Sequence, residues 1–114
     1  MKEFNELNNI LDKSIIFDPW MKDRGLHGYC EEIHGETKEL LDASNNKDFA
    51  NMQEEVGDVL RECLVICKLA EIDNKFTLKQ VLDEAIDKIK RRQPYVLENK
   101  KVTKEDAVRI WARS

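Results

Sequence analysis

The sequence predicts an all-α, four-helix-bundle-like fold with a short terminal helix. Apolar residues recur at helical spacing in several long segments, and the apolar–polar alternation of strands is absent. Proline occurs only at positions 19 and 94 and glycine only at 25, 28, 35 and 57, so few residues interrupt these segments. With 114 residues, 41% of them hydrophobic, the chain is expected to form one domain, residues 1–114, with a modest core.

The first three helices are placed by where the helical spacing begins and stops. A first helix is expected from Phe4 to about Ile16, and the segment FDPWMKDRG then interrupts the pattern. The loop-forming segment ASNNKD separates the next two helices, which are expected at about Leu26–Ala43 and Asp48–Ile72. Because the connections are short, neighbouring helices should pack antiparallel.

Two further helices are predicted in the last third of the chain. Thr77 is a favourable N-cap for a fourth helix that reaches about Arg92, and Pro94 prevents that helix from continuing. The segment TKED, which begins at Thr103, resembles a capping box with Asp in place of the usual Glu or Gln. It is expected to open a short helix that ends near Trp111.

Charge and cysteine content exclude several classes of protein. The formal net charge of -4 argues against broad, non-specific binding of nucleic acid. No apolar run approaches the roughly 20 residues that a membrane-spanning helix needs, and no signal-peptide pattern is present. The three cysteines are odd in number and lack CxxC spacing, so we expect free thiols in a reducing cytoplasm.

Two acid pairs are the first candidate functional residues. They lie in the segments GETKE and EEVGD, where Glu36 is three residues from Glu39 and Glu55 is three residues from Asp58. Acids at this spacing share one face of a helix and repel each other. Glu36 and Glu39 are expected along one edge of the apolar stripe of the second helix, together with Glu32. On the third helix Glu55 is expected on the edge of the stripe, Asp58 further round and Glu62 between them.

The apolar stripes themselves are predicted from a rotation of about 100° per residue. The stripe of the second helix comprises Leu26, Cys30, Ile33, Thr37, Leu40 and Leu41. The stripe of the third helix comprises Phe49, Met52, Val56, Val59, Leu60, Cys63 and Cys67.

Packing through these stripes would bring the two acid rows face to face. Carboxylates that meet at a half-buried seam are costly unless something positive compensates them. Magnesium is suited to this role because it prefers oxygen ligands, keeps several waters and leaves positions for substrate phosphates. The alternative is a pair of ordinary acidic flanks on solvated helices.

The fourth helix carries candidate phosphate-binding cations. Lys88 and Arg92 lie one turn apart on one edge of its apolar stripe, and Arg91 lies further round. Lysine and arginine side chains can hold phosphate oxygens. Spacing alone favours the simpler alternative, in which these cations only complement the dipole at the C-terminus of the helix.

These segments together resemble the MazG family of all-helical nucleoside triphosphate pyrophosphohydrolases. The resemblance rests on DPW at positions 18–20, ETKELLDA, EEVGDVL, KIKRRQPYVL and the tryptophan at position 111. It covers nearly all of the chain after the first helix. One departure is Gly35, because many members carry a second acid directly before the first glutamate of the motif.

The resemblance assigns roles to the candidate residues. It implies that Glu36, Glu39, Glu55 and Asp58 are the catalytic acids and bind Mg²⁺, with Mn²⁺ as a possible substitute. It also implies that the fourth helix, through Lys88 and Arg92 with Arg91 beside them, contacts the triphosphate, which is hydrolysed to a monophosphate and pyrophosphate. Family members form homodimers or larger assemblies. Trp111 either stacks on the base or pins the last helix to the core.

Three functions are compatible with the sequence. The first is a MazG-type hydrolase of standard or damaged nucleoside triphosphates, favoured by the PW and RRQPYV segments. The second is the related phosphoribosyl-ATP pyrophosphohydrolase. The third is a helical dimerisation module without activity, against which the four intact acids argue. No residue reports the preferred base.

Overall fold

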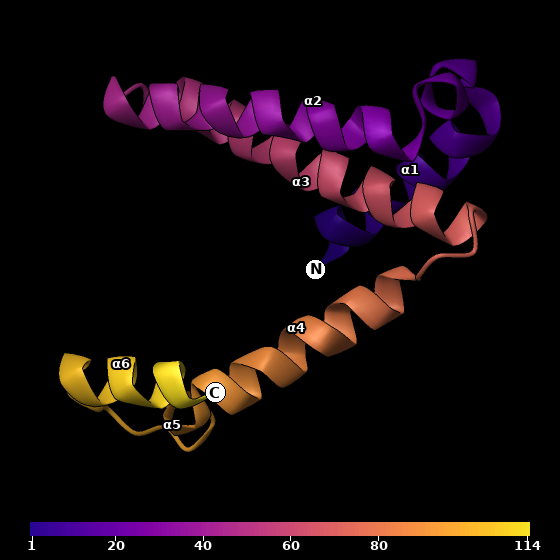
Figure 1. Cartoon of the computed structure of the whole chain (residues 1–114). Coiled ribbons are helices and arrows are strands. Elements are labelled where there is room, and N and C mark those ends of the chain that lie inside the picture. The colour runs from indigo at the N-terminus through magenta and orange to yellow at the C-terminus, as the bar shows by residue number, and fades with distance from the viewer. The chain divides into compact units, whose positions relative to one another are not determined.

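Six helices and no strand make up the protein, which confirms the predicted all-α class (Figure 1). The computed structural model describes residues 1–114, and the helices are α1 (Lys2–Phe17), α2 (Pro19–Asn45), α3 (Phe49–Ile72), α4 (Leu78–Arg92), α5 (Pro94–Leu97) and α6 (Lys104–Arg113). They fall into two compact units, Met1–Leu78 and Lys79–Ser114. None of the helices is both long and apolar enough to cross a membrane.

The first unit is built on a hairpin of two long helices. Helices α2 and α3 lie side by side along most of their length, and α1 contacts both (Figure 1). The turn at residues 46–48 joins the hairpin, with Asp48 accepting a hydrogen bond from the backbone N–H of Asn51 at 3.2 Å to cap α3. All three helices contribute to the buried core, which comprises Leu11, Ile15, Met21, Tyr29, Leu64, Val65 and Leu69.

Helix α2 begins earlier than the sequence pattern predicted. The Asp18 side chain accepts a hydrogen bond from the backbone N–H of Trp20 at 3.0 Å, and Pro19 occupies the first helical position. Both features favour a helix start. Within the predicted interruption two residues are non-helical: Asp18, which is extended between α1 and α2, and Gly25, whose φ of 73° and ψ of 178° lie outside the helical region. The expected break after the first helix is therefore a capped helical segment followed by a single non-helical residue.

The buried face of the hairpin differs from the predicted apolar stripes. On α3, Phe49, Val56 and Leu60 are exposed, whereas Glu55 and Glu62 are buried. The prediction was wrong at these positions because it assigned the interior to apolar side chains alone. Glu55 and Glu62 lie within the packed face of the helix, not along its edge, and their oxygens lie close to those of acids on α2.

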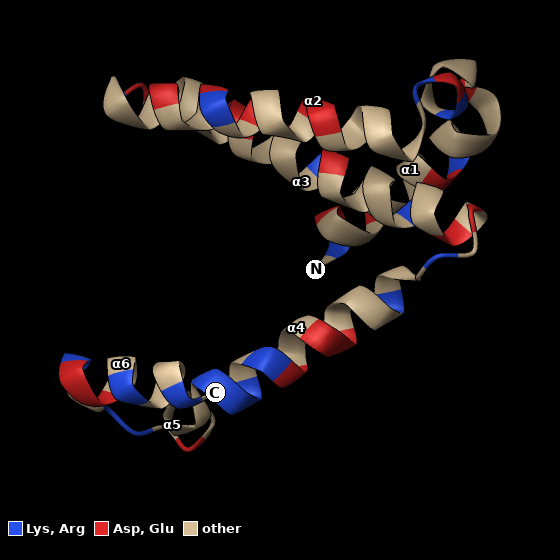
Figure 2. Ribbon diagram, in the orientation of Figure 1, with Lys and Arg blue, Asp and Glu red and all other residues tan.

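The second unit contains α4, α5 and α6. No residue of α4 is buried, and basic residues gather at its C-terminal end (Figure 2). The short α5 was not predicted, although its first residue, Pro94, stops α4 as expected. The predicted cap of α6 is confirmed, because the Thr103 hydroxyl accepts a hydrogen bond from the backbone N–H of Asp106 at 3.2 Å.

Two glycines of α2 should respond in opposite ways to the same substitution. Gly35 is helical, and a Cβ added there meets no atom within 4 Å. Gly35→Ala should therefore raise the free energy of unfolding by about 1 kcal/mol. Gly25 has φ 73°, so Gly25→Ala should lower it by about 1–3 kcal/mol. Urea unfolding measures both, and a destabilised Gly35→Ala variant would contradict the helical assignment.

Candidate metal centre

Three of the four predicted acids converge between α2 and α3. One carboxylate oxygen from each of Glu36, Glu39 and Glu55 lies within 4.8 Å of the others. Glu55 is buried at 8% exposure, Glu36 is half-buried and Glu39 is exposed. The cluster therefore reaches from the packed interior of the hairpin to solvent, where a ligand can approach Glu39.

A second acid cluster adjoins the first through a shared residue. Oxygens of Glu32, Glu36 and Glu62 also lie within 4.8 Å of one another. Glu36 thus belongs to both clusters, while Glu32 extends the group along α2 and Glu62 extends it along α3. The result is a continuous row of five carboxyl groups along the seam of the hairpin.

Crowding of the acids makes negative charge costly in both clusters. A hydrogen bond with Glu36 is the largest cause that raises the pKa of Glu55 to about 7, followed by burial and by the charge of Glu39. Burial is the largest cause that raises the pKa of Glu62 to about 7, followed by the charges of Glu32 and Glu36. A bound cation would relieve this repulsion.

The first cluster fits a hard divalent cation. Its donors are all carboxylate oxygens, the ligand type that magnesium prefers. Oε2 of Glu36 and Oε2 of Glu55 are buried and have no hydrogen-bond partner, and no lysine or arginine forms an ion pair with Glu36, Glu39 or Glu55. Two oxygens on one Mg²⁺ are at most about 4.2 Å apart, so small side-chain movements would close the cluster around the ion.

Asp58, the fourth predicted acid, belongs to neither cluster in this structure. It is half-buried and follows Glu55 by one turn of α3. Its charge contributes to the raised pKa of Glu62, so it lies close to the acid row. Its role as a metal ligand stays a prediction.

The predicted phosphate-binding cations lie in the second unit and have different surroundings. Lys88 is exposed. Nε of Arg91 donates a hydrogen bond to the backbone carbonyl of Ser114 at 3.2 Å. The guanidinium of Arg92 lies over the Trp111 ring, 4.8 Å from its centroid, and its buried Nε has no hydrogen-bond partner. This stacking joins two candidate residues from different helices, α4 and α6.

Trp111 also borders a pocket in the second unit. The pocket has a volume of about 330 Å³, and its lining is Gln93, Tyr95, Ala107, Val108, Trp111 and Ala112. Trp111 is 48% exposed, so its ring can contact a planar ligand while it stacks with Arg92. Both roles predicted for Trp111, pinning α6 and stacking on a base, are therefore compatible with its position.

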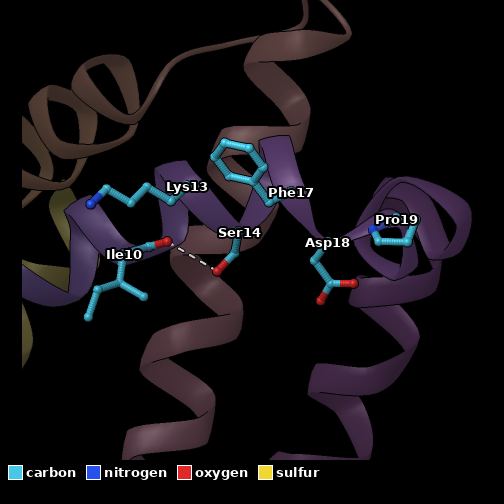
Figure 3. A pocket seen from close by; sticks show the side chains of 6 residues that line it. All are labelled: Ile10, Lys13, Ser14, Phe17, Asp18 and Pro19. Carbon is cyan, nitrogen blue, oxygen red and sulfur yellow. Dashed lines mark hydrogen bonds between the residues drawn. The ribbon is translucent and has the colours of Figure 1, made fainter.

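Another pocket lies where α1 meets α2 (Figure 3). It has a volume of about 420 Å³, and its lining is Ile10, Lys13, Ser14, Phe17, Asp18 and Pro19. Two polar side chains of the pocket are hydrogen-bonded to the helix backbone. Ser14 donates a hydrogen bond to the Ile10 carbonyl at 3.1 Å, and Asp18 caps α2. It contains no cluster of acids, so we assign the metal centre to the hairpin seam.

Glu32 and Glu62 belong to the acid row, although the family pattern in the sequence includes neither of them. The available signal was their spacing, because Glu32 precedes Glu36 by four residues and Glu62 follows Asp58 by four. Residues four apart share a helix face. The complete burial of Glu62 depends on the packing of α3 against its neighbours, which this spacing does not reveal.

The chain is similar to proteins of known family over most of its length. Residues 24–97 match the model of the MazG nucleotide pyrophosphohydrolase domain. A nucleoside triphosphate pyrophosphohydrolase of Mycobacterium tuberculosis is 30% identical over 104 residues, which cover 90% of this chain and 32% of that protein. An Escherichia coli (strain K12) protein of the same name is 30% identical over 78 residues, 68% of this chain and 30% of its own length. The chain thus spans about a third of these relatives.

A solved structure shows the same fold. The crystal structure of a mazG-related protein from Thermotoga maritima superimposes with a TM-score of 0.89 at 27% identity, and the match covers 96% of each chain.

Proposed function

Because the chain belongs to the MazG nucleotide pyrophosphohydrolase family, we propose that it hydrolyses a nucleoside triphosphate, standard or modified, to a monophosphate and pyrophosphate. The observation that carries this proposal is the convergence of Glu36, Glu39 and Glu55, with two buried oxygens that lack partners. In a protein without a metal site, buried acids that repel one another would only destabilise the fold.

The acid row would hold the metal and position the attacking water. Glu36 and Glu55 offer buried oxygens to Mg²⁺, or to Mn²⁺ in its place, and Glu39 offers an exposed one. When bound, the cation neutralises phosphate charge and lowers the pKa of a coordinated water. A carboxylate of the row that retains a free oxygen would orient that water or accept its proton.

The residues that we propose as contacts for the phosphates and the base all belong to the second unit. Lys88 would act as a point charge for phosphate oxygens, and Arg92 would offer its planar guanidinium. Arg91 adds a further positive charge at the same end of α4. Trp111 would stack on the base beside its apolar pocket.

We further propose that the protein works as a homodimer. Large apolar side chains are exposed along both long helices of the first unit and along α4, among them Leu41, Phe49, Val56, Leu60 and Ile86. Extended apolar surface of this kind is characteristic of protein–protein interfaces.

Glu55→Gln should abolish pyrophosphate release in the presence of Mg²⁺. The change removes a ligand charge and leaves the side-chain size unchanged, so the helical fold should persist. The control is Glu54→Gln, the same change at an exposed neighbour outside both clusters, which should retain activity. Chromatography of the reaction should show pyrophosphate and a monophosphate. Full activity in Glu55→Gln, or a diphosphate as the main product, would refute the proposed chemistry.

Arg92→Ala should lower kcat/KM about 10- to 150-fold, the equivalent of one charge-assisted hydrogen bond of about 1.5–3 kcal/mol. Loss of the stacking on Trp111 should cost only about 0.5–1 kcal/mol of stability. Lys90→Ala removes an exposed cation from the same turn and serves as the control for loss of charge. Normal kcat/KM with a lowered Tm would assign Arg92 a purely structural role.

Light scattering should give a molar mass of twice the 13.4 kDa of one chain, because association covers the exposed apolar faces. The mass should hold on dilution through the concentrations used for activity. A mass of 13.4 kDa throughout this range would exclude the dimer and leave the proposed chemistry untouched.

A further inference from the structure

Glu62 is the most unusual charged residue of the protein. Its side chain is fully buried at 0% exposure, and neither carboxylate oxygen has a hydrogen-bond partner. The ion pair that it forms, with Nη2 of Arg61, has a separation of 3.5 Å, beyond the usual range of an N–H···O hydrogen bond. Buried carboxylates are normally satisfied by several short bonds, so this group lacks the partners that its burial requires.

The unsatisfied oxygens of Glu62 lie beside two other acids. An oxygen of Glu62 lies within 4.8 Å of oxygens of Glu32 and Glu36. Arg24 forms an ion pair with Glu32, with 3.5 Å between Nε and Oε2, which is also beyond the usual range of an N–H···O hydrogen bond. What would satisfy all three carboxylates at once is a small cation between them.

We propose that Glu32, Glu36 and Glu62 form a second divalent-cation site, adjacent to the Glu36–Glu39–Glu55 cluster and sharing Glu36 with it. The three donors are hard oxygens from two facing helices, as Mg²⁺ or Mn²⁺ prefers. Arg24 and Arg61, each about one-third exposed on its side chain, form ion pairs with Glu32 and Glu62 and would limit the net charge of the loaded site.

This inference deepens the proposed function, because Glu36 would bridge the two ions. In proteins with paired metals the ions are about 3.5–4 Å apart and clamp one phosphate group between them. Glu39, at the solvent-exposed end of the row, would hold the first cation where a phosphate can reach it. The fully buried Glu62 would hold the second cation, and the shared Glu36 would contact both.

Manganese alone is the probe for this site. Equilibrium titration of the full chain should give two Mn²⁺ ions per chain, and electron paramagnetic resonance of the loaded protein should show a spin-coupled pair because one carboxylate bridges the ions. Glu62→Gln should reduce the stoichiometry to one and replace the coupled signal with that of an isolated ion. Glu55→Gln should also leave one ion, and the control Glu54→Gln should retain two.

Glu32→Gln is the second test, and it decides the matter if Glu62→Gln fails to fold. Glu32 is half-buried, so the fold should tolerate the amide, and the stoichiometry should again fall to one. A single ion that is lost in Glu55→Gln but retained in Glu62→Gln and Glu32→Gln would overturn the second site and leave the proposed function standing. Two ions retained in both variants would also overturn it. Two coupled ions without pyrophosphate release would refute the proposed function instead.

Discussion

The arrangement of carboxylates inside the α2–α3 hairpin is the constraint on which the rest of the molecule depends. A helix pair of this size would ordinarily bury only apolar side chains, yet Glu55 and Glu62 occupy the packed face of α3. Their negative charges oppose the burial, and the apolar core formed with α1 must outweigh this opposition. Burying these carboxyl groups lowers the stability of the fold, and such a cost is typical of sites that bind a positively charged ligand.

The helices could be predicted from the sequence more completely than their buried faces. Asp48 and Thr103 are capping residues with local partners, so the starts of α3 and α6 followed from short-range patterns. Spacing also placed Glu36 with Glu39. The burial of Glu62 and the exposure of Leu60 depend on contacts between helices, and a rule that places apolar residues inside assigns both to the wrong side.

In the second unit, too, contacts between helices could not be predicted from the sequence. Spacing grouped Lys88 with Arg92 because both are on α4, but it could not bring Arg92 to Trp111, which lies on α6. The α5 turn at Pro94–Leu97 makes that contact possible by returning the chain toward α4. A stacked guanidinium has fewer accessible rotamers than a free one, so less conformational entropy is lost when it binds an anion.

The three-residue turn between α2 and α3 has a consequence for how the acid row assembles. Every carboxylate from Glu32 to Glu62 belongs to a single helical hairpin, so no distant segment has to be brought in to complete the row. Loop closure across such a short connection has a small entropic cost, and local pairings of this kind form early in folding. The nascent hairpin would already present a cation with most of its ligands, and metal could therefore help the chain select this pairing of helices while it is still folding.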